Sequence, residues 1–512
     1  MCIVCGQGRV GLLRTIVGRY GPAPAGSSSR FVAEEIAPAI APLLDPADLE
    51  DLKGPADVIL RGGPILTLRS RDDVARAIAV RAGRIQAVGD EESVLALRGR
   101  LTRIIDLDGR ALLPGFVLAD WHPPLSLLCD WMEAHETAPE IVAAAIAGRS
   151  DEWLALMIDA SAADGIKAAI VATESRPAVA VDRTGAVLAA SAAAQALTPE
   201  LDPVQFEASK ARPHVSTILP SLLRRLAGSR DPLRARLGAL FGEAARRGVT
   251  TLRFCGLGVL AGRDDSDLVR SSAGESPALR LRGALDASLA LGSDLGRFWP
   301  RPGDDMFRVD TATHWIDAAD TDPRELAETV RALRQQEWRV TLHAESPAAI
   351  DFALDAFSAA AHSGASFDVS DGIECRAAQP AGTWARIQRL GVSVGVTPED
   401  PAVSQGRSLD LAAPPGVPLS LAHDIMAGAP EPLAILAAAA NAAGSPSVAD
   451  RLPSITADAA ARCGTRAILG ALEIGKYADF AFLDRDPRGV DLRGATQIEC
   501  IGTWLAGREI RP

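Results

Sequence analysis

The stretch that decides the fold is Leu112-Leu113-Pro114-Gly115-Phe116-Val117-Leu118-Ala119-Asp120-Trp121-His122-Pro123. An apolar run reaches a Pro-Gly pair, continues as a short strand, and ends on two residues that can bind a metal. Asp120 and His122 are two residues apart, so on an extended strand both side chains point to the same side. A carboxylate and an imidazole that leave one strand end together make the first half of a metal site. When the stretch is taken alone, the simpler interpretation is a strand end with a solvated Asp120 and a hydrogen-bonded His122.

Composition sets the broad class of the protein. The chain has 512 residues, of which 48% are hydrophobic, so it can bury a large core in two to four domains or in one large barrel with an accessory domain. Its net charge of -12 argues against a nucleic-acid partner and against an anionic membrane surface. The seven cysteines are odd in number and scattered, which predicts a reducing compartment without a disulfide framework. With no membrane-length apolar run and no signal-peptide pattern, a cytoplasmic location is expected.

Residues 1–55 have the character of an extension. Cys2 and Cys5 form a lone CxxC motif, which is weak evidence for zinc or redox chemistry because no second pair of ligands completes it. Residues 21–29 are a flexible linker by composition. The segment 31–44 has apolar residues at helical spacing, and it is a candidate contact in a homodimer.

The rest of the chain divides by its pattern. Residues 56–115 and 466–512 read as short strands and turns, with a hairpin expected around Ala82-Gly83, so both ends together predict one composite β-sandwich domain. Residues 116–465 repeat a helix followed by a short apolar strand, with a variable insertion around 124–235. Such units are typical of a parallel α/β architecture, and there are enough of them for a (β/α)8 TIM-like barrel. The chemistry of such a barrel lies at the C-terminal ends of its strands.

Three of these helix–strand units are clear enough to predict with boundaries. They are Leu233–Gly248 with Val249–Leu252, Arg324–Gln336 with Trp338–Leu342, and Ala381–Leu390 with Val392–Val396. Polar residues that can bind a metal follow several of the apolar strands, namely Asp120, His122, His343, His423 and Asp424.

The order of these motifs resembles the amidohydrolase superfamily, in particular the branch called amidohydrolase family 3, over roughly residues 56–510. The motifs that carry the resemblance are Ala56–Gly63, Ala79–Gly89, Ile104–Gly109, Leu113–Phe116, Gly470–Phe480 and Leu483–Pro487. The resemblance implies a sandwich that leads into a metal-bearing barrel. It also implies hydrolysis of a carbon–nitrogen bond in a small amide-like substrate.

The ligand set that the resemblance implies is altered in this chain. Asp120-Trp121-His122 stands where the family has His-x-His, and His343 matches the third histidine. Cys375 replaces the next histidine, and Asp424 matches the late aspartate that binds metal and acts as general base. The family's bridging lysine is missing, and His314 is either its replacement or an ordinary core histidine. The Asp-Gly-His segment is Thr184-Gly185-Ala186, and the acidic residue after His343 falls in the altered Glu345-Ser346-Pro347.

Two interpretations remain open from the sequence. In the first, Asp120, His122, His343, Cys375 and Asp424 bind one divalent ion, and Asp424 takes a proton from water. Zinc is favoured for this ligand set, with iron or manganese as alternatives. In the second, the protein is a catalytically lapsed homologue that acts as a subunit, a scaffold or a ligand-binding protein. The expected partners are a small-molecule substrate and a second copy of the chain, or an intact homologue in a hetero-oligomer.

Overall fold

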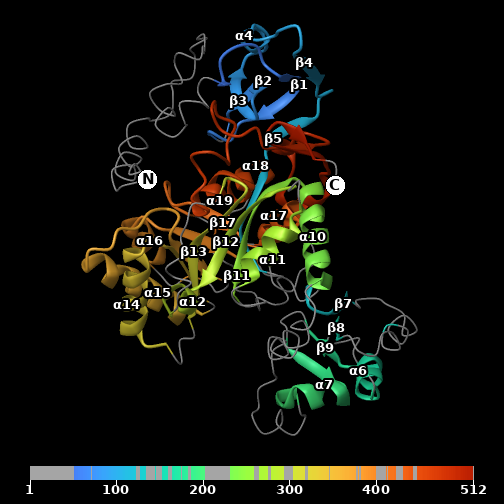
Figure 1. Cartoon of the computed structure of the whole chain (residues 1–512), viewed down its shortest axis with the longest axis vertical. Helices are drawn as coiled ribbons and strands as arrows, with labels where there is room; N and C mark the ends of the chain where they lie inside the picture. The colour runs from blue at the N-terminus through green and yellow to red at the C-terminus, as the bar shows by residue number, and fades with distance from the viewer. Residues whose placement is uncertain are drawn as a thin grey trace.

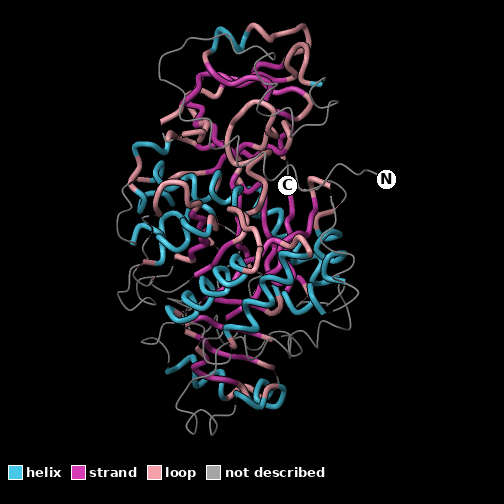
Figure 2. The backbone as a smooth tube through the Cα atoms, turned by 90° about the vertical axis from the view of Figure 1, so that its left-hand side faces the viewer, coloured by secondary structure: helices cyan, strands magenta, loops and turns pink. Residues whose placement is uncertain are grey.

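The computed structural model has a β-rich unit, a central barrel and a small lobe, arranged in this order along the longest axis (Figure 1). Figure 2 shows the same order in a view turned by 90°. The N-terminal extension, with Cys2, Cys5 and the segment 31–44, lies outside the described residues. The structure describes residues 51–70, 72–122, 127–133, 145, 153–158, 164–174, 176–182, 186–201, 231–258, 264–274, 278–292, 304–316, 321–344, 346–375, 379, 382–398, 411, 413–422, 431–441 and 447–510.

The β-rich unit is built from both ends of the chain, as the sequence predicts. One eight-stranded sheet has the order β20-β19-β18-β5-β1-β2-β3, and β4 pairs with the first part of β1. One apolar cluster in this unit includes Leu60, Ile78 and Phe480, and a second one includes Ile59, Ala77 and Val94 of α4. The elements are β1 (Val58–Leu66), β2 (Val74–Arg81), β3 (Arg84–Gly89), α4 (Glu91–Leu95), β4 (Arg103–Asp106), β5 (Ala111–Pro114), β18 (Phe480–Leu483), β19 (Cys500–Leu505) and β20 (Arg508–Glu509).

The predicted hairpin is confirmed between β2 and β3. Arg81 pairs with Arg84, and the two turn residues, Ala82 and Gly83, have positive φ values of 49° and 77°. Two positive φ values in a two-residue loop match the right-handed twist of the flanking strands. Sequence periodicity and turn chemistry therefore agree at this point.

The Pro-Gly step of the opening stretch joins the sheet to the barrel. Pro114 ends β5, which pairs with β18, and β6 begins at Phe116. A Cβ atom on Gly115 would lie 2.2 Å from Oγ1 of Thr250, which lies on the neighbouring barrel strand Val249–Leu257. Only glycine therefore allows the chain to pass this close to Thr250.

The central unit is a nearly closed barrel of eight parallel strands in the order β17-β16-β15-β14-β13-β12-β11-β6. Helices lie around these strands (Figure 2). The strands are β6 (Phe116–Trp121), β11 (Val249–Leu257), β12 (Arg280–Asp286), β13 (Phe307–Ile316), β14 (Arg339–Ala344), β15 (Gly372–Cys375), β16 (Ser393–Val396) and β17 (Leu419–Leu421). The helices are α10 (Asp231–Arg246), α11 (Asp265–Ser272), α12 (Ala287–Gly292), α14 (Pro323–Gln335), α15 (Pro347–His362), α16 (Thr383–Leu390), α17 (Pro432–Ala438), α18 (Val448–Arg451) and α19 (Ala457–Arg462).

The three predicted helix–strand units are present in this barrel. They are α10 with β11, α14 with β14, and α16 with β16, and their observed starts lie within two residues of the predicted ones. The starts of α14 and α15 carry typical helix-start signals. Asp322 and Ser346 cap the two helices with their side chains, and each cap is followed by a proline in the first turn.

A separate lobe lies between β6 and α10 in the chain, within the predicted insertion (Figure 1). Its four-stranded sheet has the order β10-β9-β8-β7, with an apolar cluster that includes Leu156, Ile170 and Ala180. The elements are β7 (Asp130–Glu133), β8 (Leu154–Met157), α6 (Asp164–Val171), β9 (Ala178–Val181), β10 (Val187–Ala190) and α7 (Ala192–Leu197). Among the residues that the structure describes, none of the helices combines the length and apolar character needed to cross a bilayer.

Candidate metal centre

Two histidines and one glutamate converge inside the barrel. His122 Nε2 lies 3.1 Å from Oε1 and 3.0 Å from Oε2 of Glu374, and His343 Nδ1 lies 2.8 Å from Oε2. One candidate ligand atom from each of the three residues lies within 4.8 Å of the others. This is a spacing at which three side chains can share one metal ion.

The barrel topology brings these three residues together. His122 directly follows β6, His343 lies next to the last residue of β14, and Glu374 lies next to the last residue of β15. All three therefore come from the C-terminal ends of strands, where barrels of this type carry their chemistry. Their side chains are only 2 to 6% exposed, so the cluster is shielded from bulk water.

The electrostatics of the cluster keep Glu374 charged. Burial alone would raise the pKa of Glu374, but the two imidazoles beside it and the hydrogen bond from His122 hold this pKa well below its usual value. An ionised carboxylate is the form that binds a metal.

The ligand atoms of His122, His343 and Glu374 suit a divalent metal ion. The contact of His343 Nδ1 with Glu374 is short but does not have the direction of a hydrogen bond. Neither ring nitrogen of His343 has a hydrogen-bond partner within the described part of the chain. Buried polar atoms without a hydrogen bond are costly, and coordination of a metal satisfies them. Two imidazole nitrogens with one carboxylate are a donor set that zinc accepts, with room for a further ligand.

Trp315, at the end of β13, forms one side of the cluster. Its ring stacks on His343 with centroids 4.5 Å apart and an angle of 14° between the planes, and it meets the His122 ring at 5.5 Å. The residue is 46% exposed, whereas the two histidines beside it are buried. The indole therefore separates the imidazole of His343 from solvent and restrains its orientation.

Exchange of Trp315 for alanine is expected to expose His343. The modification rate of His343 by diethyl pyrocarbonate should rise severalfold, because reagent access is limited by the covering ring. Peptide mapping by mass spectrometry distinguishes this histidine from the other six. Trp315→Phe keeps an aromatic cover and should retain the slow rate. Equal rates in the wild type and in Trp315→Ala would show that the indole does not shield the cluster.

Asp120 lies in the barrel interior but outside this cluster. Its Oδ2 accepts a hydrogen bond from Arg462 Nε at 2.6 Å, and its Oδ1 pairs with Arg253 Nη2 and accepts from Arg462 Nη2 at 3.3 Å. Burial would raise the pKa of Asp120, but the positive charges of Arg253 and Arg462 hold it below its usual value. Both carboxylate oxygens are engaged by guanidinium groups, which leaves little capacity for a metal.

The same ion pairs link the two ends of the barrel sheet. Asp120 is on the first strand, β6, and Ser420 on the last strand, β17, donates a hydrogen bond to Asp120 Oδ2 at 3.4 Å. Arg462 also donates to Ser393 Oγ on β16 at 3.0 Å. Arg462 comes from α19 and is completely buried, so its guanidinium fills space inside the barrel. We call Arg253, Asp120 and Arg462 the interior ion-pair triad.

Gly395 makes room for this triad. A Cβ atom at this position would lie 2.6 Å from Oδ2 of Asp120 and 3.1 Å from Nε of Arg462. Gly395→Ala is expected to lower the free energy of unfolding by ~1–3 kcal/mol, the usual cost of overpacking a rigid core. Urea unfolding followed by circular dichroism measures it. Gly89→Ala is the control, because a Cβ atom at Gly89 meets nothing within 4 Å; equal effects of the two substitutions would contradict the argument.

The remaining predicted site residues have different placements. Cys375 is buried next to Glu374 but is not in the described cluster, and burial raises the pKa of its thiol to about 12. Its thiol donates to the backbone carbonyl of Gly395 at 3.6 Å, so the sulfur has a partner of its own outside the cluster. Half-buried His314 is also outside the cluster. Asp424, His423, Glu345 and the segment 184–185 lie outside the described residues, so the predicted roles of Asp424 as ligand and base stay predictions.

Glu374 is the site residue that sequence reasoning missed. The motif Ile373-Glu374-Cys375 directs attention to Cys375, because that residue occupies the position of a histidine in the resemblance. Neighbouring residues on a strand point to opposite sides, so only one of Glu374 and Cys375 can face the two histidines. A buried, charged residue at a strand end is a signal for a partner, and this signal favours Glu374.

The structure thus combines a (β/α)8 barrel, a candidate metal centre at the strand ends and a sheet made from both ends of the chain. The sequence profile described as "Amidohydrolase family" matches residues 103–511. The chain therefore belongs to the amidohydrolase family, as its sequence motifs predict.

The individual proteins that match this chain share a third or less of its residues over the aligned regions. Imidazolonepropionase from Symbiobacterium thermophilum is 32% identical over 186 residues, which are 35% of this chain and 43% of that protein. The match thus spans less than half the length of this curated relative. An uncharacterized metal-dependent hydrolase from Pyrococcus furiosus aligns with 84% of this chain and 99% of its own, with a TM-score of 0.63 and 19% identity. An adenosine deaminase from Xanthomonas campestris with bound zinc aligns with 89% of this chain and 93% of its own, with a TM-score of 0.57 and 14% identity. These two structures support the fold.

Proposed function

We propose that this protein is a metal-dependent hydrolase that cleaves a carbon–nitrogen bond in a small amide-like molecule. The observation that carries the proposal is the convergence of His122, His343 and Glu374 at the C-terminal ends of the barrel strands. Membership of the amidohydrolase family supports the reaction class. The names of two relatives, a metal-dependent hydrolase and a deaminase with bound zinc, agree with it.

In this proposal His122, His343 and Glu374 hold one divalent ion, with zinc favoured by the donor set. When bound, such an ion lowers the pKa of water and polarises a carbonyl group. Trp315 keeps the His343 ring in place and limits the access of bulk water. Asp424, which follows β17 in the sequence by three residues, is the proposed general base that removes the proton from the attacking water.

The interior ion-pair triad supports a site for one ion and not for two. Asp120 stands at the position of the first family ligand, and two guanidinium groups already neutralise its carboxylate. A second cation there would face the positive charges of Arg253 and Arg462 in a medium of low dielectric constant, which is unfavourable.

One observation favours the alternative, a catalytically lapsed homologue. Two of the ligands expected from the sequence have other partners: Asp120 pairs with two arginines, and the thiol of Cys375 donates to a backbone carbonyl. A barrel held by its own ion pairs folds without a metal, so the fold alone does not require activity.

The deciding experiment measures metal content and turnover on the same preparation. The full chain is produced with added zinc, dialysed and assayed by elemental analysis, then tested against a panel of N-acyl compounds and cyclic amides. The proposal expects close to one ion per chain and a turnover that Asp424→Asn abolishes. A chain free of metal and inactive on the whole panel supports the lapsed homologue instead.

A further inference from the structure

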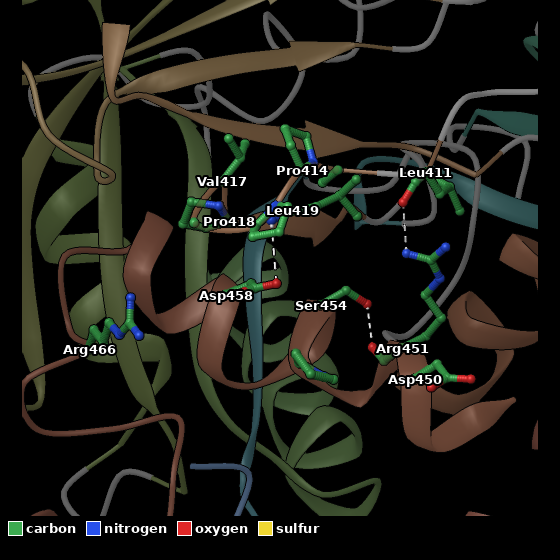
Figure 3. A pocket seen from close by; sticks show the side chains of 14 residues that line it. Leu411, Pro414, Val417, Pro418, Leu419, Asp450, Arg451, Ser454, Asp458 and Arg466 are labelled. Atoms are coloured by element: carbon green, nitrogen blue, oxygen red, sulfur yellow. Dashed lines mark hydrogen bonds between the residues drawn. The ribbon is translucent and has the colours of Figure 1, made fainter. Parts of the chain in front are cut away.

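A cavity lies at the opposite end of the barrel from the candidate metal centre. Its volume is about 330 Å³, and it opens beside the N-terminal end of β17 (Figure 3). The loop before β17, the segment from α18 to the start of α19, and Arg466 after α19 line it. The candidate ligands occupy the C-terminal ends of the strands, so this cavity is separate from the metal centre.

Asp458 is the first unusual group in this cavity. It lies in the first turn of α19, and within the described chain its one hydrogen bond comes from the backbone N–H of Leu419 at 3.5 Å (Figure 3). Burial raises the pKa of this carboxyl to about 6, against the opposing effects of the Leu419 N–H and of the positive charges on Arg466 and Arg451. A largely desolvated carboxylate with one long hydrogen bond gains from a cationic partner.

Arg466 is the second unusual group. It is exposed, and its guanidinium has no ion pair or hydrogen bond with the part of the chain that the structure describes. Arg451 differs, because it donates to Leu411 O at 2.8 Å and its own carbonyl accepts from Ser454 Oγ at 2.6 Å (Figure 3). The cavity thus combines a fixed polar frame with one acidic and one basic group that are available to a ligand.

The walls of the cavity are rich in proline. Four prolines line it, and each has a fixed φ angle, so little conformational freedom is lost when a ligand binds. They are Pro414, Pro415, Pro418 and Pro453. The volume lies at the lower end of the range for small-molecule sites, roughly 300–1,000 Å³. A ligand of the size of an amino acid suits this space.

We propose that this cavity binds a small zwitterion, with its ammonium group on Asp458 and its carboxylate on Arg466. A simple cation would leave Arg466 without a partner, and a simple anion would add a negative charge beside Asp458. A zwitterion satisfies both groups at once, which neither kind of ion with a single charge can do.

The cavity lies next to the elements that join the ends of the barrel sheet. Asp458 and Arg462 lie one turn apart on α19, and Arg462 holds Asp120. Leu419, which contacts Asp458, precedes Ser420, which donates to the same Asp120. A ligand that binds only the folded chain raises the melting temperature, so thermal unfolding reports occupancy without any enzymatic assay.

The test uses the full chain as purified, with glycine, β-alanine and γ-aminobutyrate as zwitterionic probes. Propionate and propylamine serve as analogues with a single charge, and titration calorimetry and thermal unfolding are the readouts. At least one zwitterion should bind about tenfold more tightly than either analogue, a difference that corresponds to the loss of one charged contact.

Two variants and a control assign the contacts. Asp458→Asn and Arg466→Met should each weaken binding of the best zwitterion by about tenfold or more. Arg485→Met, which removes an exposed arginine on another surface, should leave binding unchanged.

The proposal is overturned if no probe binds at millimolar concentration, if an analogue with one charge binds as tightly, or if both cavity variants bind like the wild type. Metal content and turnover do not enter these measurements, so the outcome is independent of the proposed hydrolase function.

Discussion

Exchange of Glu374 for glutamine is expected to abolish binding of the metal ion that the proposed function places at this site. The substitution keeps the shape of the side chain but replaces a charged ligand by a neutral amide, in a site where the other donors are two imidazole nitrogens. Metal affinity should fall by more than about 100-fold, because even residues that only orient a ligand contribute 10- to 100-fold. Elemental analysis after dialysis measures the loss, and the proposed hydrolysis should disappear with the metal.

Three further variants make this result specific. His122→Ala and His343→Ala should lose the metal in the same way, because their nitrogens are the other donors. Glu328→Gln on the exposed side of α14 is the matched control and should keep the wild-type metal content. If Glu374→Gln retains the ion while both histidine variants lose it, Glu374 orients the histidines and is not itself a ligand.

Exchange of Asp120 for asparagine is expected to be strongly destabilising. It leaves the guanidinium groups of Arg253 and Arg462 buried without their counter-charge, while their side chains are completely inaccessible to water. Removal of one partner from a buried ion pair costs ~3–5 kcal/mol, which is a large part of the ~5–15 kcal/mol that stabilises a typical protein. Urea unfolding followed by circular dichroism measures the change.

The control for this substitution is an exposed ion pair. Asp108→Asn removes a carboxylate that lies 2.7 Å from Arg110 on the surface, and it should cost at most ~1 kcal/mol. Metal content adds a second readout to the Asp120 variant. A folded Asp120→Asn chain that keeps its full stability but loses its metal would restore the role of metal ligand that the sequence predicts for Asp120.

Local sequence patterns were sufficient for much of the fold. The turn at Ala82-Gly83 and the capped helix after Asp322 each depend on residues next to each other in the chain. Their physics is local, since it concerns backbone conformation, capping hydrogen bonds and the period of apolar side chains. The parallel barrel follows from the repetition of such units, and the family profile confirms the resemblance that the motif order predicts.

Local patterns were not sufficient for the site. Asp120 carries the same carboxylate whether it binds a metal or an arginine, and its partners, Arg253 and Arg462, are 133 and 342 residues away in the sequence. Glu374 and Cys375 are adjacent and equally able to act as ligands by residue type. The register of β15 in the barrel decides which of the two joins His122 and His343.

The sequence by itself determined that the chain forms a (β/α)8 barrel joined to a sheet built from both termini, and that His122 and His343 lie at strand ends. Only the tertiary structure decided that Glu374 completes the cluster and that Asp120 belongs to an internal ion-pair triad. The physical reason is that burial and charge act between side chains across the barrel. The short stretch from Leu112 to Pro123 therefore specifies the entry into the barrel, whereas its partners on distant strands and on α19 specify what Asp120 and His122 do there.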